Sequence, residues 1–497
     1  MTGSAVSTRV STGSAGLDEV LCGGLPVRRM YLLQGGPGVG KTTLSLQFLL
    51  EGLRRGECCL YVTLSETKAE LLAVAASHGW DLSGIHIYEM YAGEALDEDA
   101  DEDNTLYMPA EVELGERMKA LLAEVDRVKP SRVVLDSSSE LRLLAQSPLR
   151  FRRQLLALKQ RLVRRDCTVY LLESSITPSD PMIHSLVHGV ITIEQLSPLY
   201  GAERRRMRVV KLREVAFRGG YHDMTIEQDG VQVFPRLVAA EHRTTHPGGS
   251  FTSGVSELDA MIGGGLDQGT STLLLGPSGS GKSAIASQYA VTTAARGEKV
   301  AMFAFDEGSD TLLRRSASLG MDIASHVEAG RILLQQVDPA ELAPGQFSAT
   351  VRRMVEHEGV RLVVIDSLNG YLHAMPEEQF LSAHLHELLS YLNQIGVVTI
   401  LVMAQQGLLG SMEAPIDVSY LADTVVLTRY FEAKGRVRKA ISVLKRRSGV
   451  HEDTIREIMF DKRGLRAGPP LSDFHGVLTG VPVLGIRDSE ALLSQDA

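Results

Sequence analysis

Short apolar runs alternate along the chain with longer segments in which apolar residues recur at helical spacing. The runs hold about five residues each, a length that favours strands over helices. In the first half we predict strands at 30–34, 59–64, 132–136, 168–172 and 190–194, and helices at 41–54, 67–78, 111–127 and 150–164. Apolar strands that alternate with helices are typical of the α/β class, in which helices flank both faces of a mostly parallel sheet.

The same order of elements occurs twice. In the second half we predict strands near 271–275, 299–305, 361–365, 397–403 and 424–428. When the sequence is shifted by 241 residues, it aligns with itself without a gap for about seventy positions, and 12 of 30 residues are identical between 13–42 and 254–283. The repeated unit is far longer than that of a solenoid, so the repeat indicates two tandem domains.

A polar segment that contains Pro and Gly separates the two repeats, as a linker would. We predict a first domain at 1–240, a linker at 241–250, a second domain at 251–484 and a short tail at 485–497. A length of 497 residues is too great for one hydrophobic core, which agrees with this division.

Composition narrows the functional class. The formal net charge of −10 does not favour a broad nucleic-acid-binding face. The four cysteines form no C-x-x-C pair, so neither a zinc ribbon nor a redox motif is indicated. No window approaches the roughly 18 apolar residues of a membrane span, and the N-terminus has no apolar signal core. We therefore expect a cytoplasmic protein.

Each half contains a glycine-rich turn between a predicted strand and a predicted helix. Residues 35–42 read GGPGVGKT and residues 276–283 read GPSGSGKS, and both match the P-loop pattern G-x-x-x-x-G-K-[ST]. Backbone N–H groups of such a turn and the helix dipole attract a phosphate chain. The predicted ATP ligands are Gly35, Gly36, Gly38, Gly40, Lys41, Thr42, Thr43, Gly276, Gly279, Gly281, Lys282 and Ser283. A turn without a ligand is the alternative, and the recurrence of the whole element argues against it.

An aspartate ends a buried apolar strand in each half, at Asp136 and Asp366. A carboxylate at this place can hold Mg²⁺ in the Walker-B arrangement, together with the hydroxyl of Thr42 or Ser283. Without a cation, burial of a carboxylate is costly. The alternative is that each aspartate only caps a helix.

Further acidic residues follow the neighbouring strand. Glu66 aligns with Glu307, and Ser65 aligns with Asp306, so the second half has two adjacent carboxylates and the first half has one. We predict that Glu66, Asp306 and Glu307 are catalytic, because carboxylates here could orient and deprotonate a water or a hydroxyl. Alternatively, Glu66 and Glu307 belong to capping boxes of the following helices.

Two charged segments have a less specific meaning. Residues 94–103 are densely acidic, and we predict a solvated loop, with a docking site for a basic partner as the alternative. Arginines cluster on the helix predicted at 150–164, which we expect to face solvent or another subunit rather than nucleic acid. They are Arg150, Arg152, Arg153, Arg161, Arg164 and Arg165.

Two RecA-like halves, each with a P-loop, acidic residues after the next strand and a late Lys-x-Arg, resemble the KaiC family of circadian-clock ATPases. The resemblance reaches to about residue 484 and includes Gly-Trp-Asp at 79–81, Gly-Met-Asp at 320–322 and the stretch 445–451. It implies a homo-oligomer in the form of a hexameric double ring, with ATP between neighbouring subunits. It also implies a protein signalling partner.

The resemblance assigns trans-acting cations to two Lys-x-Arg pairs, Lys211/Arg213 and Lys445/Arg447. Such cations would neutralise charge on the phosphoryl group of the neighbour's ATP. His451 matches a family histidine near the nucleotide, whereas Phe217 takes that place in the first half. The alternative for the four cations is an ordinary place at a strand edge.

In the KaiC family the second ring phosphorylates itself on an adjacent Ser-Thr pair. Ser419 aligns with the serine, and Tyr420 replaces the threonine, so a two-step cycle cannot run unchanged. Asp306 would take the place of the glutamate that activates the hydroxyl, with one methylene less. Ser65 cannot serve as a base, and we expect slow turnover in both halves. The short tail implies that the family's stimulating partner is absent or binds differently.

The sequence therefore predicts an ATP- and Mg²⁺-dependent ATPase with serine autokinase activity, which acts as a signalling or clock-like regulator. A RecA-type motor that acts on DNA would share the core, but the acidic charge and the lack of an added DNA-binding module argue against it. A regulatory scaffold whose ATP state controls ring assembly is compatible with the first hypothesis. Ser65 favours the scaffold role for the first half.

Overall fold

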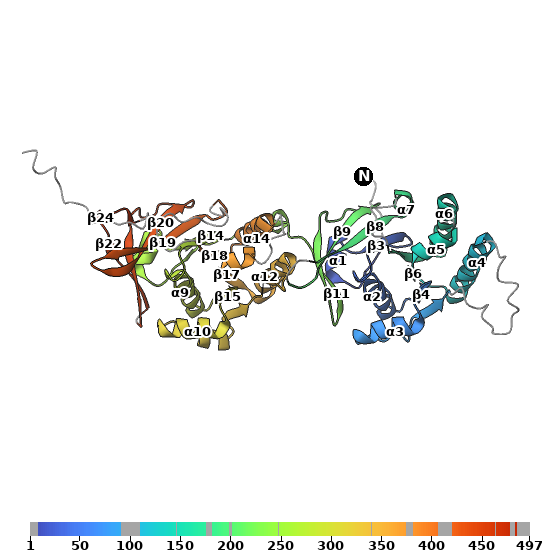
Figure 1. Ribbon diagram of the computed structural model, residues 1–497, viewed down its shortest axis with the longest axis horizontal. Helices are drawn as coiled ribbons and strands as arrows, with labels where there is room; N and C mark the ends of the chain where they lie inside the picture. The colour runs from blue at the N-terminus through green and yellow to red at the C-terminus, as the bar shows by residue number, and fades with distance from the viewer. Residues whose placement is uncertain are drawn as a thin grey trace, which may run out of the picture. The chain divides into compact units, whose positions relative to one another are not determined.

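The chain folds into two compact units, Met1–Arg236 and Leu237–Ala497 (Figure 1). The computed structural model describes residues 8–90, 110–145, 147–174, 181–197, 201–246, 248–338, 340–373, 381–405, 420–462, 464–477 and 483–484. The acidic segment 94–103, the phosphorylation candidate Ser419 and the tail 485–497 lie outside these residues. Each unit is built on one nine-stranded sheet.

The sheet of the first unit has the strand order β11-β10-β9-β8-β3-β7-β6-β4-β5. Its strands are β3 (Met30–Gly35), β4 (Cys59–Thr63), β5 (His86–Glu89), β6 (Arg132–Asp136), β7 (Thr168–Glu173), β8 (Gly189–Leu196), β9 (Arg204–Leu212), β10 (His222–Glu227) and β11 (Gly230–Phe234). The six strands from β5 to β8 are parallel, and β8 to β11 continue the sheet in antiparallel pairs. A two-stranded ribbon, β1 (Arg9–Val10) with β2 (Leu25–Pro26), precedes it.

The second unit repeats this plan in the order β16-β15-β17-β18-β14-β19-β20-β21-β22. Its strands are β14 (Ser271–Gly276), β15 (Lys299–Ala304), β16 (Ile332–Gln336), β17 (Val360–Asp366), β18 (Val398–Ala404), β19 (Thr424–Ala433), β20 (Arg436–Arg446), β21 (Arg456–Asp461) and β22 (Gly464–Pro470). Two short ribbons accompany it: β12 (Ser250–Phe251) with β13 (Leu266–Asp267), and β23 (Phe474–His475) with β24 (Val483–Leu484).

Helices cover both faces of each sheet. In the first unit they are α1 (Ala15–Val20), α2 (Lys41–Arg54), α3 (Lys68–Ser77), α4 (Ala110–Val128), α5 (Ser138–Ala145), α6 (Pro148–Arg164) and α7 (Pro181–Leu186). In the second unit they are the 3₁₀ turn η1 (Ala239–His242), α8 (Ser256–Met261), α9 (Lys282–Ala295), α10 (Ser309–Ser318), α11 (Ile323–Glu328), α12 (Pro344–Glu358), α13 (Leu368–His373) and α14 (Leu381–Gln394).

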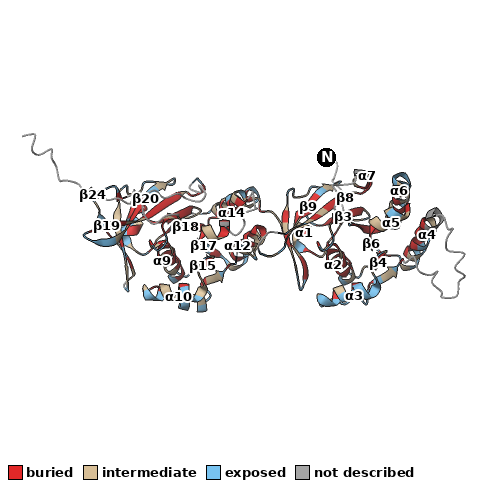
Figure 2. Cartoon of the chain, viewed as in Figure 1, coloured by how far each residue is buried: buried red, intermediate tan, exposed pale blue. Residues whose placement is uncertain are grey.

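The core of each unit has two main apolar layers, one on each face of the sheet. Figure 2 shows the buried residues of both units in red. Successive residues of the central strand β3 point to opposite layers: Leu33 packs with α2, and Leu32 packs with α4 and α6. In β14, Leu274 and Leu273 divide in the same way between α9 on one face and α12 and α14 on the other. A strand buried on both faces reads as a continuous apolar run, which is why the pattern in the sequence located these strands.

The predicted α/β fold is confirmed. Each predicted strand and helix corresponds to one in the structure, with ends that differ by a few residues. The antiparallel extension was not predicted, because β9 and β20 carry many charged residues. In β9, Met207 and Val209 are buried while Arg208 between them is exposed, so the strand alternates and has no continuous apolar run.

The boundary between the repeats contains packed residues. Leu237 and Ala239 belong to an apolar layer of the second unit, and the N–H of Ala239 donates to Glu387 Oε2 at 3.1 Å. The N–H of Thr244, inside the predicted linker 241–250, donates to Gln394 O at 3.4 Å. The exact domain limits remain a prediction. Among the helices described above, none is long and apolar enough to cross a membrane.

Candidate nucleotide sites

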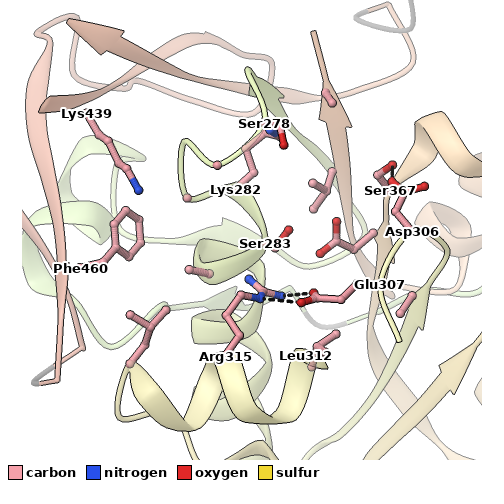
Figure 3. A pocket seen from close by; sticks show the side chains of 18 residues that line it. Ser278, Lys282, Ser283, Asp306, Glu307, Leu312, Arg315, Ser367, Lys439 and Phe460 are labelled. Carbon is pink, nitrogen blue, oxygen red and sulfur yellow. Dashed lines mark hydrogen bonds and ion pairs between the residues drawn. The ribbon is translucent and has the colours of Figure 1, made fainter. Parts of the chain in front are cut away.

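A cavity of about 390 Å³ opens above the P-loop of the second unit. Figure 3 shows the side chains around it. Residues that the sequence predicted, Lys282, Ser283, Asp306, Glu307 and Asp366, line it together. They come from the P-loop, the start of α9, the end of β15 and the end of β17. The carboxyl ends of parallel strands meet at one edge of a sheet, which is why residues distant in sequence meet here.

Both P-loops contain a glycine that no other residue could replace without strain. Gly40 and Gly281 cap the following helices in left-handed conformations, with φ of 99° and 105°. A Cβ atom on Gly40 would lie 2.6 Å from Ile226 Cδ1, and one on Gly281 would lie 2.2 Å from Phe460 Cζ. Both the backbone conformation and the lack of space therefore require glycine at these two positions.

The P-loop lysines fold back onto their own loops. Lys282 Nζ donates to Gly276 O at 2.9 Å and to Pro277 O at 2.7 Å. Lys41 Nζ donates to Gly35 O at 2.8 Å and to Gly36 O at 2.7 Å. Burial lowers the pKa of Lys282 to about 8, although the charge of Asp366 opposes the shift. Burial also lowers the pKa of Lys41, and Asp136, Glu173 and Glu66 oppose that shift. Each ammonium is thus buried and would gain from an anionic ligand.

The residues predicted to hold Mg²⁺ are in direct contact in the second unit, and in the first unit the Tyr61 hydroxyl links them. Ser283 hydrogen-bonds to Asp366, and burial raises the pKa of Asp366. In the first unit the Tyr61 hydroxyl donates to Asp136 Oδ2 at 2.6 Å and is itself hydrogen-bonded to Thr42. Burial raises the pKa of Asp136 as well. A hydroxyl beside a buried carboxylate is an oxygen donor set that Mg²⁺ accepts, and the cation would offset the cost of burying the carboxylate charge.

The acidic residues predicted as catalytic have different partners in the two units. Asp306 accepts a hydrogen bond from Ser367 Oγ. Glu307 accepts two from Arg315, at 3.3 and 2.9 Å. In the first unit, Glu66 Oε2 is buried without a hydrogen-bond partner in the part of the chain that the structure describes. The capping box of α3 uses Thr67 and Glu70, so the alternative role of Glu66 as its glutamate is not supported.

Several residues at these sites were not predicted from the sequence. Arg315, Lys439 and Phe460 line the cavity of the second unit, and Lys439 Nζ lies 5.1 Å from the centre of the Phe460 ring. In the first unit Glu173 is buried at the end of β7, where it accepts from Ser138 Oγ and raises the pKa of Lys41. Glu173 could have been found in the sequence, because it is a charged residue directly after the apolar run 168–172. Arg315, Lys439 and Phe460 lie on a helix or on antiparallel strands, and no motif or spacing in the sequence indicates them.

The two Lys-x-Arg pairs lie away from the P-loop of their own unit. Lys211 pairs with Val190 near the start of β8, whereas Gly35 of the P-loop lies beside Ile193. Lys445 has the equivalent place and donates to Ala422 O at 2.8 Å. Lys445, Arg447 and His451 do not line the cavity described in their own unit. In the second unit, the structure therefore does not bring these predicted residues into the cavity above the P-loop.

The fold and the sites define a class of protein. A P-loop after a central parallel strand, a carboxylate at the end of a neighbouring strand, and helices on both faces are the features of a RecA-like P-loop NTPase domain, and this chain has two. The family model described as "ATPase: KaiC" matches residues 10–238 and again 251–471. The chain therefore belongs to the KaiC ATPase family.

Similar proteins cover almost the whole chain. "Circadian clock protein KaiC3" from Synechocystis sp. is 25% identical over 496 residues, which is 98% of this chain and 97% of the relative. "Circadian clock oscillator protein KaiC" from Synechococcus elongatus is 26% identical over 498 residues, with 98% and 94% covered. The protein of the same name from Parathermosynechococcus lividus is 25% identical, with 95% and 87% covered.

Proposed function

We propose that this chain forms a homo-oligomeric ring and hydrolyses ATP at two sites per subunit. Each site is completed by a Lys-x-Arg pair from a neighbouring subunit. The resemblance to the KaiC family implies that the ring is a hexamer. The observation that carries the proposal comes from the second unit, where the residues predicted to bind phosphate and Mg²⁺ line one cavity, whereas Lys445 and Arg447 do not line it. A cation supplied by a neighbour makes hydrolysis depend on assembly.

The first unit supports this arrangement electrostatically. Burial lowers the pKa of Lys211, and the nearby charges of Arg213 and Lys159 lower it further. Lys211 Nζ donates to the backbone oxygens of His184 and Val187. A group of like charges at a subunit surface is stabilised by an anion, and the phosphates of a neighbour's ATP would provide one.

Each residue then has a distinct role. The P-loop N–H groups and Lys41 or Lys282 bind the β- and γ-phosphates. Thr42 with Asp136, and Ser283 with Asp366, would hold Mg²⁺, which neutralises phosphate charge when bound. Glu66 in the first unit, and Glu307 or Asp306 in the second, orient the attacking water and accept its proton.

Mixing variants tests whether the sites are shared. Lys282→Ala and Arg447→Ala should each abolish hydrolysis at the second site. In an equimolar mixture, about a quarter of the interfaces would join an intact P-loop to an intact Arg447, so hydrolysis should return to that fraction. Glu66→Gln in all subunits removes the background of the first site. A mixture as inactive as its components, although mass measurement shows mixed rings, would contradict the shared site.

We further propose that the second unit transfers phosphate to Ser419. The serine Oγ would attack the γ-phosphorus, the bond to the β–γ bridging oxygen would break, and the proton would pass to Asp306 or Glu307. Labelled ATP and peptide mapping test this, with Ser419→Ala as the control and Tyr420→Phe to exclude the neighbouring hydroxyl. ADP formation without label at Ser419 would leave an ATPase only.

The names of the relatives suggest a role as a clock-like signalling regulator.

A further inference from the structure

The predicted catalytic carboxylates of the two units differ in one contact. In the second unit, both oxygens of Glu307 are occupied by the guanidinium of Arg315, with Nε–Oε1 at 3.3 Å and Nη2–Oε2 at 2.9 Å. Figure 3 shows this fork-on-fork pair at the floor of the cavity, below Ser283. The two side chains are 29% and 28% exposed, so solvent screens the pair only in part. The geometry is that of a bidentate, charge-assisted contact.

The matching position of the first unit holds an apolar side chain instead of a cation. The helices α3 and α10 correspond residue for residue under the shift of 241, and Arg315 therefore corresponds to Val74. Val74 packs against the apolar core. Glu66 Oε2 is consequently left buried and without a partner among the described residues. Glu66 and Glu307 thus occupy equivalent positions with opposite surroundings.

The surroundings decide how well a carboxylate accepts a proton. Burial raises the pKa of Glu66, and repulsion by Asp136 and Glu70 raises it further against the opposing charge of Lys41. Glu307 lies near Asp366 and next to Asp306, but Arg315 adds a cation in direct contact. A guanidinium that contacts both oxygens occupies the lone pairs that a water would use.

We propose that Arg315 is a positioning residue that restrains Glu307 and so keeps hydrolysis in the second unit slower than in the first. This inference rests on the proposed function and adds a regulatory element to the second site. In the second unit, ATP would persist longer for other uses, such as phosphate transfer. In the first unit, Val74 leaves Glu66 free to act on water.

The test uses the full-length protein and the variant Arg315→Val, which installs the residue of the first unit. Glu66→Gln silences the first site in every sample, and single-turnover measurements isolate the chemical step. We expect Arg315→Val to speed ADP formation by about threefold or more, because both oxygens of Glu307 are then available to accept a hydrogen bond from the attacking water. Affinity for a non-hydrolysable ATP analogue should stay unchanged, because Arg315 is proposed to act on Glu307 and not on the nucleotide.

The reciprocal variant provides an independent check. With Glu307→Gln and Asp306→Asn silencing the second site, Val74→Arg should slow the first site by about threefold and move the acid limb of its pH–rate profile to lower pH. Arg315→Lys should lie between wild type and Arg315→Val, because one ammonium cannot hold both oxygens. Arg314→Val removes a charge from the same helix and should not change the rate.

Other outcomes would overturn the inference. If Arg315→Val binds nucleotide normally but hydrolyses it at an unchanged or lower rate, Arg315 does not restrain Glu307. A Val74→Arg variant that hydrolyses ATP at the unchanged rate of the first site would also contradict the proposal. The Lys41→Ala/Lys282→Ala double variant separates this result from failure of the proposed function. If that double variant still hydrolyses ATP, the proposed function itself is wrong.

Discussion

At the scale of single residues, the P-loop lysine of the second unit couples nucleotide binding to pH. Lys282 is buried, and its pKa is lowered to about 8. Only the charged ammonium attracts phosphate, so above this pH the lysine must take up a proton to bind. We therefore predict that affinity for ATP at the second site falls as the pH rises through 8, by up to about tenfold per unit.

The measurement is a titration of a non-hydrolysable ATP analogue between pH 7 and pH 9.5, in Lys41→Ala protein so that only the second site binds. Adding Lys282→Arg gives the matched control, because a guanidinium stays charged throughout this range. The affinity of this control should be independent of pH. Equal slopes with and without the Lys282→Arg substitution would assign the pH dependence to another group.

The residues of the candidate site could be predicted to different extents. Lys282, Ser283 and Asp366 follow from short motifs at strand ends, and the structure brings them into one cavity. Arg315 could not be predicted, because its role depends on helix α10 turning one side chain back toward Glu307 eight residues earlier. The spacing of residues in the sequence does not show which neighbour a side chain on a helix will point toward.

At the scale of elements, the buried parallel strands were predictable, whereas the parallel edge strands β5 and β16 and the antiparallel strands were not. The run 30–34 is apolar almost throughout because β3 is buried on both faces. The charged strand β20 is the third strand from one edge of its sheet, and its buried residues are the four consecutive ones at 440–443. The place of such a strand in the sheet depends on the strands that it pairs with. Its register cannot be predicted from its own sequence alone.

The end of β20 carries an anchor built on one arginine. The side chain of Arg446 is 7% exposed, and its Nη2 donates to Asp267 Oδ2 at 2.8 Å. The Arg446 guanidinium also donates hydrogen bonds to Ile262 O and Ser448 Oγ. Leu212 takes the place of Arg446 in the first unit. Because Arg446 lies between Lys445 and Arg447, it fixes the segment that carries both proposed trans-acting cations.

We predict that Arg446→Leu slows hydrolysis at the second site several-fold and lowers the stability of the second unit by about 1–2 kcal/mol, a value reduced for the partial exposure of Asp267. The first site should keep its rate. Single-turnover hydrolysis and denaturant unfolding measure the two effects, with Leu212→Ala as the control in the other unit. A second site that keeps its full rate despite the lost stability would show that the anchor does not position the cations.

At the scale of the whole molecule, the two units have kept one scaffold and diverged where chemistry is controlled. Both units retain the P-loop lysine and a strand-end aspartate that is hydrogen-bonded to a hydroxyl, that of Tyr61 in the first unit and that of Ser283 in the second. The differences lie around the carboxylates, where Tyr61 and Glu173 occur only in the first unit and Arg315 only in the second, among the described residues. Such a division suits a protein whose two sites bind the same nucleotide and use it at different rates.

The start of the second unit gives the last prediction. Leu237 and Ala239 are 7% and 5% exposed within its core, and the His242 ring lies edge-on to Tyr391 with centroids 5.0 Å apart. A fragment 237–497 keeps these contacts, whereas a fragment 249–497 loses them and still keeps strand β12. We predict that the shorter fragment is less stable by about 2–4 kcal/mol, because it exposes the apolar surface that these residues cover.

Denaturant unfolding of both fragments measures the difference, and Leu237→Ala in the longer fragment should reproduce about 2 kcal/mol of it by deletion of one buried side chain. If the two fragments unfold at the same denaturant concentration, residues 237–248 have no packing role, which would agree with the predicted linker at 241–250. If the prediction is correct, the segment that joins the units is part of the second core, and its apolar residues pack there although most of its residues are polar.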